Sequence, residues 1–388
     1  MKIVIDAAIT GAEAQFAGLG EVRLLPGRDM DPAAVRDADV LVVRTVTRVD
    51  SALLEGSKVR FVASATSGTD HVDLDYLVRA GIGFASAAGC NARAVAEYVL
   101  SALCALAQQE GRDLRGRRAG IIGCGHVGSQ VVSLLEACGI TCLVNDPPLA
   151  RQRPGDRVFH DLEEVLDADI VSLHVPLVRD GDYPTLNLMD ERFLGELREE
   201  AVLINTSRGE VVDETALCAF LDARPRAAAV VDVWRDEPCI NTRLLKRARL
   251  GTPHIAGYSY DAKLRATRMV YQGVCGFMDV PAAGTAIAAG AEMAGTLRLS
   301  GWKNDLEAVA MAVLGSYDVR SDSASLMRIL EVQEDRRGTF FDALRNQYPM
   351  RREFPCLRVE LDHCSDSLER RLRALGFQTQ TADDTNDA

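Results

Sequence analysis

Ala119-Gly-Ile-Ile-Gly-Cys-Gly-His-Val-Gly-Ser-Gln130 is the stretch that decides the fold of this 388-residue chain. An apolar strand leads into three glycines at G-x-G-x-x-G spacing, and a helix begins inside the turn. Glycine suits such a turn because the backbone must bend sharply and approach a pyrophosphate, whose charge is met by helix N-terminal amides. A purely structural glycine turn is the alternative. The predicted cofactor residues of the turn are Gly123, Gly125, His126, Val127 and Gly128.

The next strand-like run, 141–145, ends at Asp146. The dinucleotide fingerprint places an acidic residue near this point to accept hydrogen bonds from the adenosine ribose hydroxyls. A carboxylate there repels a 2′-phosphate, so NAD is favoured over NADP as the cofactor. The alternative is a turn aspartate that only precedes Pro147 and Pro148.

Strand-like runs alternate with helical patterns on both sides of the glycine turn, which predicts an α/β protein with parallel sheets. The turn begins only at residue 123, so the region before it is a separate lobe, and we expect the ligand cleft between the lobes. The predicted fold is two Rossmann-like, doubly wound lobes followed by a C-terminal α+β domain. The expected boundaries are a substrate-binding lobe at 1–93, completed by 255–283, an NAD-binding domain at 94–254, the C-terminal domain at 284–380 and a disordered tail at 381–388.

Composition excludes several classes of function. The net charge of −12 argues against nucleic acid or an anionic membrane as the partner. No apolar run reaches the roughly 18 residues of a membrane span, and no secretory signal is evident, so a cytoplasmic location is expected. The ten cysteines form no C-x-x-C pair and are expected to be reduced thiols. With six dispersed histidines and no H-E-x-x-H, no metal site is predicted.

Three segments at predicted strand ends carry charged residues: 205–209, 232–238 and 252–257. Ligands of open α/β sheets bind outside the carboxyl ends of the strands, where these side chains can converge. Arg208 can fork onto a substrate carboxylate, and His254 can remove a hydroxyl proton. Glu237 can stabilise the protonated imidazole. Taken singly, each residue has an ordinary alternative: a surface arginine, a helix-start acid and a loop histidine.

These segments resemble the D-isomer-specific 2-hydroxyacid dehydrogenase family. INTSRGEVVD (204–213), VVDVWRDEP (230–238) and TPHIAGY (252–258) match its successive signatures, with the catalytic trio at Arg208, Glu237 and His254. VVRTVTRVD (42–50), ATSGTDHVD (65–73) and YPMRREF (348–354) extend the likeness to a branch that oxidises a phosphorylated four-carbon hydroxy acid for pyridoxal phosphate synthesis. That branch carries a C-terminal dimerisation domain, so the resemblance implies a homodimer.

The resemblance also implies contact residues. For the cofactor, they are Asp146, Val175, Thr206, Ser207, Arg208, Asp232 and Gly257. For the substrate, they are Thr45, Thr66 and Tyr258. Two positions depart from the family pattern, because Thr45 stands where serine is expected and His126 where asparagine is expected.

A phosphorylated substrate needs an anion site. Arg44, with backbone amides near 66–68, is the hypothesis, and the Arg351-Arg352 pair is a second basic spot that could contribute across a dimer. Solvated surface arginine is the alternative. His71 and His174 are expected to be structural.

Two other functions share these features. Another enzyme of the family, such as a 3-phosphoglycerate dehydrogenase or a hydroxypyruvate/glyoxylate reductase, would keep the same trio. A corepressor-like protein that senses NADH would keep the fold, but it would not need Arg208, Glu237 and His254 together.

Overall fold

The computed structural model describes residues 1–111, 114–155, 158–282, 293–362 and 364–381. The chain forms two compact units. Unit 1 comprises Met1–Asn91 and Ser259–Glu292, and unit 2 comprises Ala92–Tyr258 and Met293–Ala388. The C-terminal region therefore belongs to the same unit as the region of the glycine turn. Residues 283–292 lie outside the described residues, as do residues 382–388 of the expected tail.

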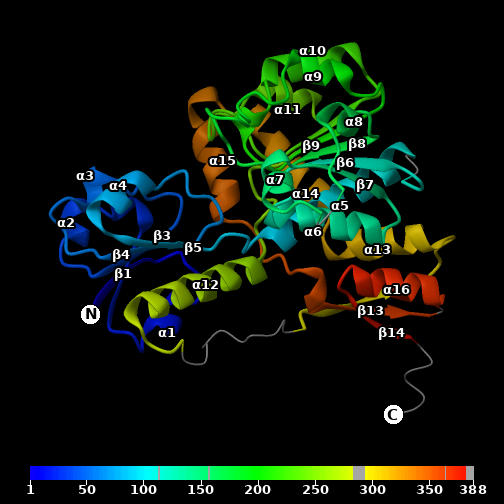
Figure 1. Ribbon diagram of the computed structural model, residues 1–388. Helices are drawn as coiled ribbons and strands as arrows, with labels where there is room; N and C mark the ends of the chain where they lie inside the picture. Colours follow the sequence, from blue (N-terminus) through cyan, green and yellow to red (C-terminus); the bar gives the residue numbers. More distant parts are fainter. Residues whose placement is uncertain (112–113, 156–157, 283–292, 363, 382–388) are drawn as a thin grey trace. The chain divides into compact units, whose positions relative to one another are not determined.

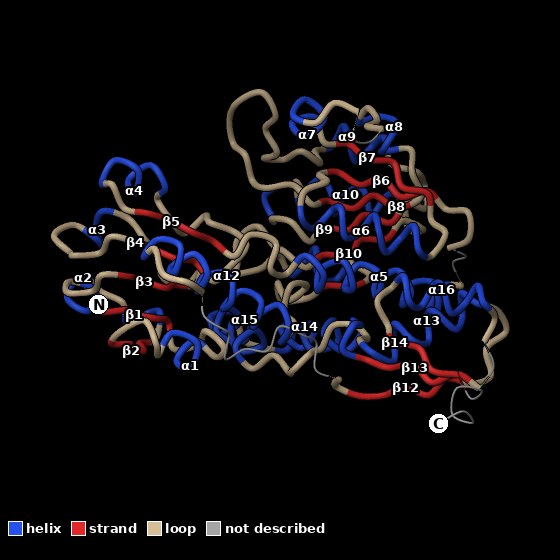
Figure 2. The backbone as a smooth tube through the Cα atoms, turned by 60° about the horizontal axis from the view of Figure 1, so that its bottom comes forward, coloured by secondary structure: helices blue, strands red, loops and turns tan. Residues whose placement is uncertain are grey.

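Unit 1, whose strands β1, β3, β4 and β5 are labelled in Figure 1, is built on a five-stranded parallel sheet. Its strand order is β2-β1-β3-β4-β5, and all five strands are labelled in Figure 2. Apolar side chains alternate between its faces, as the two-residue period of a strand requires. Ile3 and Ile5 face α1 and α12, whereas Val4 faces the helices α2 to α4. The elements are β1 Lys2–Asp6, α1 Ala12–Phe16, β2 Glu21–Leu25, α2 Pro32–Val35, β3 Val40–Val43, α3 Ser51–Leu54, β4 Phe61–Ser64, α4 Leu74–Ala80, β5 Gly83–Ser86 and α12 Tyr260–Met278.

Unit 2 begins with the long helix α5, Ala92–Glu110. It packs with α6 on one face of a six-stranded parallel sheet in the order β11-β10-β9-β8-β6-β7, and α8 to α11 cover the other face. This doubly wound arrangement confirms the predicted α/β class. The remaining elements are β6 Arg118–Ile122, α6 His126–Ala137, β7 Thr141–Asn145, α7 Pro147–Gln152, α8 Leu162–Leu166, β8 Ile170–Leu173, α9 Glu191–Glu196, β9 Val202–Asn205, α10 Glu214–Ala223, β10 Ala228–Val231, α11 Thr242–Arg247 and β11 Leu250–Gly251.

The C-terminal region contains helices and a parallel three-stranded sheet, with β12, β13 and β14 side by side (Figure 2). It shares its core with the nucleotide-binding part: Val309 and Leu368 bury their side chains in the same cluster as α5 and α6, and Phe341 lies in the cluster that holds Trp234. The elements are β12 Gly295–Leu299, α13 Asp305–Ser316, α14 Val319–Met327, α15 Arg337–Asn346, β13 Leu357–Leu361, α16 Asp366–Ala374 and β14 Gln378–Thr381. Among the described residues, no helix is long and apolar enough to cross a membrane.

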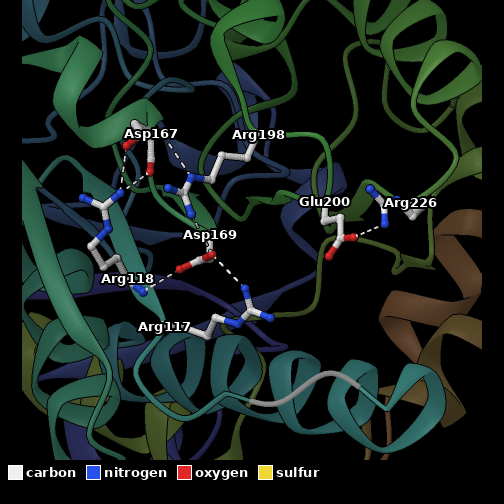
Figure 3. A network of polar contacts seen from close by, with 7 residues as sticks. All are labelled: Arg117, Arg118, Asp167, Asp169, Arg198, Glu200 and Arg226. Atoms are coloured by element: carbon white, nitrogen blue, oxygen red, sulfur yellow. Dashed lines mark hydrogen bonds and ion pairs between the residues drawn. The ribbon is translucent and has the colours of Figure 1, made fainter.

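An ion-pair network lies at the amino ends of the unit 2 strands (Figure 3). Asp169 Oδ1 accepts hydrogen bonds from Arg117 Nη1 at 2.9 Å and Arg198 Nη1 at 3.1 Å, and its Oδ2 accepts from the Arg118 backbone at 2.9 Å. Asp167 pairs with Arg118 and Arg198, and Glu200 pairs with Arg226. Ligands of parallel sheets bind at the carboxyl ends. The network is therefore a stabilising feature on the edge away from the candidate site.

Candidate active site

The three glycines of the turn have two different roles. Two of them allow close backbone contacts, and the third leaves room for a ligand. Gly123 has a φ of +87°, and a Cβ there would lie 2.7 Å from the His174 carbonyl oxygen. A Cβ on Gly128 would lie 2.0 Å from the Gly123 oxygen, whereas one on Gly125 would meet open space. No side chain caps α6 at Gly125, so its first amides can receive an anion. The turn therefore fits a pyrophosphate.

Asp146 flanks this turn. Its Oδ2 accepts a hydrogen bond from the Cys124 amide at 2.7 Å, and its Oδ1 accepts from the Leu149 amide at 2.9 Å, capping α7. Each carboxylate oxygen can accept a further hydrogen bond. The turn role and the predicted ribose role are thus compatible, and the residues around the turn fit NAD.

His174 and Val175 follow β8, the strand beside β6. His174 receives contacts on both ring nitrogens, from Ser172 Oγ at 2.9 Å and Thr206 Oγ1 at 3.3 Å, and burial lowers its pKa to about 3. A neutral, fully bonded imidazole is structural, as expected. Val175 borders the glycine turn, because its Cγ1 would lie 2.9 Å from a Cβ on Gly123. The turn occupies the β6/β8 switch point, where ligands of such sheets bind.

The loop that carries Arg208 is fixed by its own side chains. Asn205 Oδ1 accepts hydrogen bonds from the amide and hydroxyl of Ser207, at 3.1 and 2.8 Å, and Asn205 Nδ2 donates to the Arg208 carbonyl at 3.0 Å. A Cβ on Gly209 would lie 2.1 Å from the Trp234 carbonyl carbon. This loop and the loop after β10 therefore pack backbone to backbone, and glycine is required at their contact.

Glu237 and His254 form the central pair. Glu237 Oε2 lies 2.7 Å from His254 Nδ1, while Oε1 accepts a hydrogen bond from the Trp234 amide at 2.9 Å. Burial alone would raise the pKa of Glu237, but the His254 charge and hydrogen bond and the Trp234 amide outweigh it, so the pKa lies below its ordinary value. His254 has a φ of +56°, and its side chain is 35% exposed. The carboxylate thus fixes one ring nitrogen, and the other is available to a substrate.

Asp232 braces the loop that carries His254. Its carboxylate accepts hydrogen bonds from the Thr252 hydroxyl at 2.6 Å and from the Ile255 and Ala256 amides at 2.8 and 3.0 Å. Its backbone carbonyl accepts from the His254 amide at 2.8 Å. Burial raises the pKa of Asp232. The loop continues through Gly257 to Tyr258, whose hydroxyl accepts a hydrogen bond from Arg345 Nη2 at 3.2 Å.

Sequence reasoning missed Arg345. It lies in the C-terminal helix α15, outside every motif, and only the fold brings it to Tyr258. The other basic spot differs from expectation: Arg351 is buried, donates to the carbonyls of Ala256 and Ala94, and lies 3.8 Å over the Tyr317 ring. The prediction of an anion site at Arg351 is therefore wrong, because its guanidinium is used inside the unit.

Unit 1 holds the predicted substrate residues at the carboxyl ends of β3 and β4. Arg44 forks onto the buried Asp6, with Nε–Oδ2 at 2.9 Å and Nη2–Oδ1 at 3.2 Å, at the β1/β3 switch point of this sheet. Thr45 is exposed. Thr66 Oγ1 lies 2.7 Å from Ser64 Oγ, which also contacts His71 Nε2 at 3.0 Å. Burial lowers the pKa of His71, in keeping with its expected structural role.

Comparison with known proteins relates the chain to one enzyme family. Residues 92–256 match the D-isomer specific 2-hydroxyacid dehydrogenase NAD binding domain, and residues 293–376 match a domain of unknown function (DUF3410). The chain is 47% identical to an erythronate-4-phosphate dehydrogenase of Pseudomonas syringae, over 97% of this chain and 99% of that protein. It is 46% identical to the protein of that name from Azotobacter vinelandii, over 97% and 100% of the two chains.

Two solved structures share the fold. The NAD+-bound 3-phosphoglycerate dehydrogenase of Entamoeba histolytica superimposes with a TM-score of 0.63 at 23% identity, over 74% of this chain and 98% of that chain. The D-lactate dehydrogenase of Aquifex aeolicus, complexed with NAD and lactic acid, gives 0.61 at 22% identity, over 72% and 96%. About a quarter of this chain thus has no counterpart in either structure.

Proposed function

The chain belongs to the erythronate-4-phosphate dehydrogenases, within the D-isomer specific 2-hydroxyacid dehydrogenases, and we propose that it oxidises 4-phospho-D-erythronate to 2-oxo-3-hydroxy-4-phosphobutanoate. The cofactor is NAD, and the reaction serves pyridoxal 5′-phosphate biosynthesis. The observation that carries the proposal is the Glu237–His254 pair, 2.7 Å apart, in the same unit as the glycine turn. A histidine paired with a carboxylate in this way can act as a proton acceptor. The pair therefore argues against the alternative of a binding protein without activity.

The residues of the chain divide the reaction between them. His254 accepts the proton of the C2 hydroxyl on the ring nitrogen that does not face Glu237. Glu237 holds the imidazole in one tautomer and stabilises its charge as the proton arrives. Arg208 orients the substrate carboxylate with its planar donors. Bound NAD would supply the acceptor for the hydride that leaves C2.

In this proposal, residues of unit 1 bind the substrate phosphate. Arg44 already neutralises Asp6, but the fork uses only two of its five N–H donors. The remaining donors, with the hydroxyls of Thr45 and Thr66, are the groups that we assign to the substrate, together with Tyr258. The Asp6 fork also gives Arg44 a fixed direction, which a phosphate site requires.

The C-terminal region is the proposed dimer interface. Its edge strand β12 is largely exposed over Gly295–Leu299, and an exposed edge favours pairing or coverage. We also propose that the enzyme acts in the cytoplasm. Sedimentation of the full chain tests the dimer, and a monomer at micromolar concentration would contradict it.

The test of the activity is a substrate panel. Purified protein is mixed with 4-phospho-D-erythronate, 3-phosphoglycerate or glycerate, and NADH formation is followed by absorbance. A parallel assay adds a 2-oxo acid acceptor, so that tightly held NADH does not hide turnover. Preference for 4-phospho-D-erythronate is expected, and preference for 3-phosphoglycerate would contradict the substrate while leaving the class intact.

The phosphate assignment has its own variants. Arg44→Leu alone would strand the buried Asp6 carboxylate, which typically costs about 3–5 kcal/mol. The informative protein is therefore Asp6→Asn with Arg44→Leu, compared with Asp6→Asn. The double variant should raise the KM for the phosphorylated substrate far more than for glycerate. Equal effects on both substrates would remove Arg44 from the phosphate site.

A further inference from the structure

We propose that Arg345, in the C-terminal region of unknown function, is a positioning residue for the oxidation site, acting through Tyr258 and Glu237. The inference rests on the proposed function. It assigns to the region a role in the reaction itself, beyond dimerisation.

Helix α15 lies along the loops of the nucleotide-binding part. Near its start, a Cβ on Gly338 would lie 3.3 Å from Pro238 Cγ, so the helix touches the residue next to Glu237. One turn later Phe341 is fully buried in the cluster with Trp234. Arg345 follows four residues on, on the same face of the helix. The packing of α15 therefore fixes where the Arg345 side chain begins.

The Arg345 guanidinium is directed to the end of the catalytic loop. Its Nη2 donates to the Tyr258 hydroxyl at 3.2 Å, and its central carbon lies 5.8 Å from the Tyr258 ring centroid and 6.0 Å from that of Phe341. Its Nε is buried and has no hydrogen-bond partner among the described residues. A second C-terminal residue, Tyr348, meets the Tyr258 ring edge to face at 5.8 Å. Tyr258 is thus held from two sides by this region.

The charge of Arg345 acts on the catalytic carboxylate. Burial alone would lower the pKa of Arg345, but Tyr258, Glu237 and Asp232 outweigh it and raise it. In return, Arg345 is one of the groups that keep the pKa of Glu237 below its ordinary value. A Glu237 that stays ionised remains an acceptor for His254. The arginine therefore supports both the substrate contact at Tyr258 and the charge of the pair.

This role is an addition to the shared fold. About three quarters of this chain superimposes on the two solved dehydrogenases. That part covers 98% of the 3-phosphoglycerate dehydrogenase and 96% of the D-lactate dehydrogenase. A different family model matches residues 293–376, which include Arg345, whereas the NAD-binding model matches 92–256. Arg345 thus lies outside the residues that the dehydrogenase family model matches.

The test compares full-length Arg345→Gln and Arg345→Lys with Arg337→Gln, a control on the same helix whose Nε donates to the Val332 carbonyl at 3.2 Å. Loss of a charged hydrogen bond predicts that kcat for 4-phospho-D-erythronate falls about ten- to a hundredfold in Arg345→Gln. Arg345→Lys keeps the positive charge but not the planar guanidinium, so kcat should fall only severalfold. The NAD dissociation constant and the melting temperature should stay near wild type in both, and Arg337→Gln should match wild type throughout.

A double variant separates positioning from a general loss of structure. If Arg345 acts through Glu237, the kcat effect of Arg345→Gln should shrink when Glu237→Gln is already present. Wild-type kcat in both Arg345 variants, full additivity with Glu237→Gln, or an equal loss in Arg337→Gln would overturn the proposal. Should Arg345→Gln fail to fold, Arg345→Lys decides, and an unchanged kcat there overturns it. If the wild type prefers another 2-hydroxy acid, the substrate assignment fails and the same comparison is made with that acid.

Discussion

Replacing Glu237 by Gln tests the central pair with the least change of shape. Glutamine keeps the volume of the side chain and can still accept from the Trp234 amide, which lies 2.9 Å from Oε1. It removes the negative charge that lies 2.7 Å from His254 Nδ1. The side chains of the pair are only 19% and 35% exposed, so solvent replaces little of the lost interaction.

The expected magnitude follows from the strength of a hydrogen bond to a charged group. Such a bond contributes about 1.5–3 kcal/mol, and each 1.36 kcal/mol is a factor of ten in rate. We therefore expect kcat to fall about ten- to a hundredfold.

The assay is NADH formation at saturating substrate, for wild type, Glu237→Gln and the control Asp236→Asn. Asp236 is the exposed neighbour of Glu237, so its variant changes the net charge equally without touching the pair. A kcat of Glu237→Gln within threefold of wild type would refute the assignment of the pair. An equal fall of kcat in Asp236→Asn would show that the effect of Glu237→Gln comes from the change in net charge.

Three further changes separate folding from function. Gly128→Ala should abolish measurable NAD binding by calorimetry and cost about 1–3 kcal/mol of unfolding free energy, because its Cβ would lie 2.0 Å from the Gly123 oxygen; Gly195→Ala, in open space within α9, should do neither. Burial raises the pKa of the Glu97 carboxyl to about 7. The protonated carboxyl therefore stabilises the folded state below the pKa of Glu97 in the unfolded chain, and this stabilisation is lost as pH rises through 7. Urea titrations should show that Glu97→Gln removes up to about 3 kcal/mol of that pH dependence, and parallel curves for the two proteins would count against it. Asp169→Asn should lose about 1–3 kcal/mol of unfolding free energy with kcat unchanged, since it breaks the network at the amino ends of the strands; a fall in kcat at full stability would contradict this separation.

Local pattern was sufficient for the parts of the molecule that local chemistry determines. The glycine spacing predicted the turn between β6 and α6, and β-branched runs predicted parallel strands, because each signal arises within a dozen residues. The Glu237–His254 contact could also be predicted, since both residues follow neighbouring strands at the carboxyl edge. The use of Arg351 could not, because its partners at Ala94 and Ala256 lie far away in the sequence.

The placement of Arg345 shows why such a residue escapes a sequence-based search. Its proposed role depends on the packing of α15 against Pro238 and Trp234, and these partners lie far from position 345 in the sequence. A basic residue in an amphipathic helix is ordinarily a solvated one. Here a glycine admits the helix close to the loop, and a buried phenylalanine sets its rotation. The guanidinium then donates to Tyr258, although no sequence motif marks Arg345. In this way, packing alone can bring a residue of the C-terminal region to the proposed active site.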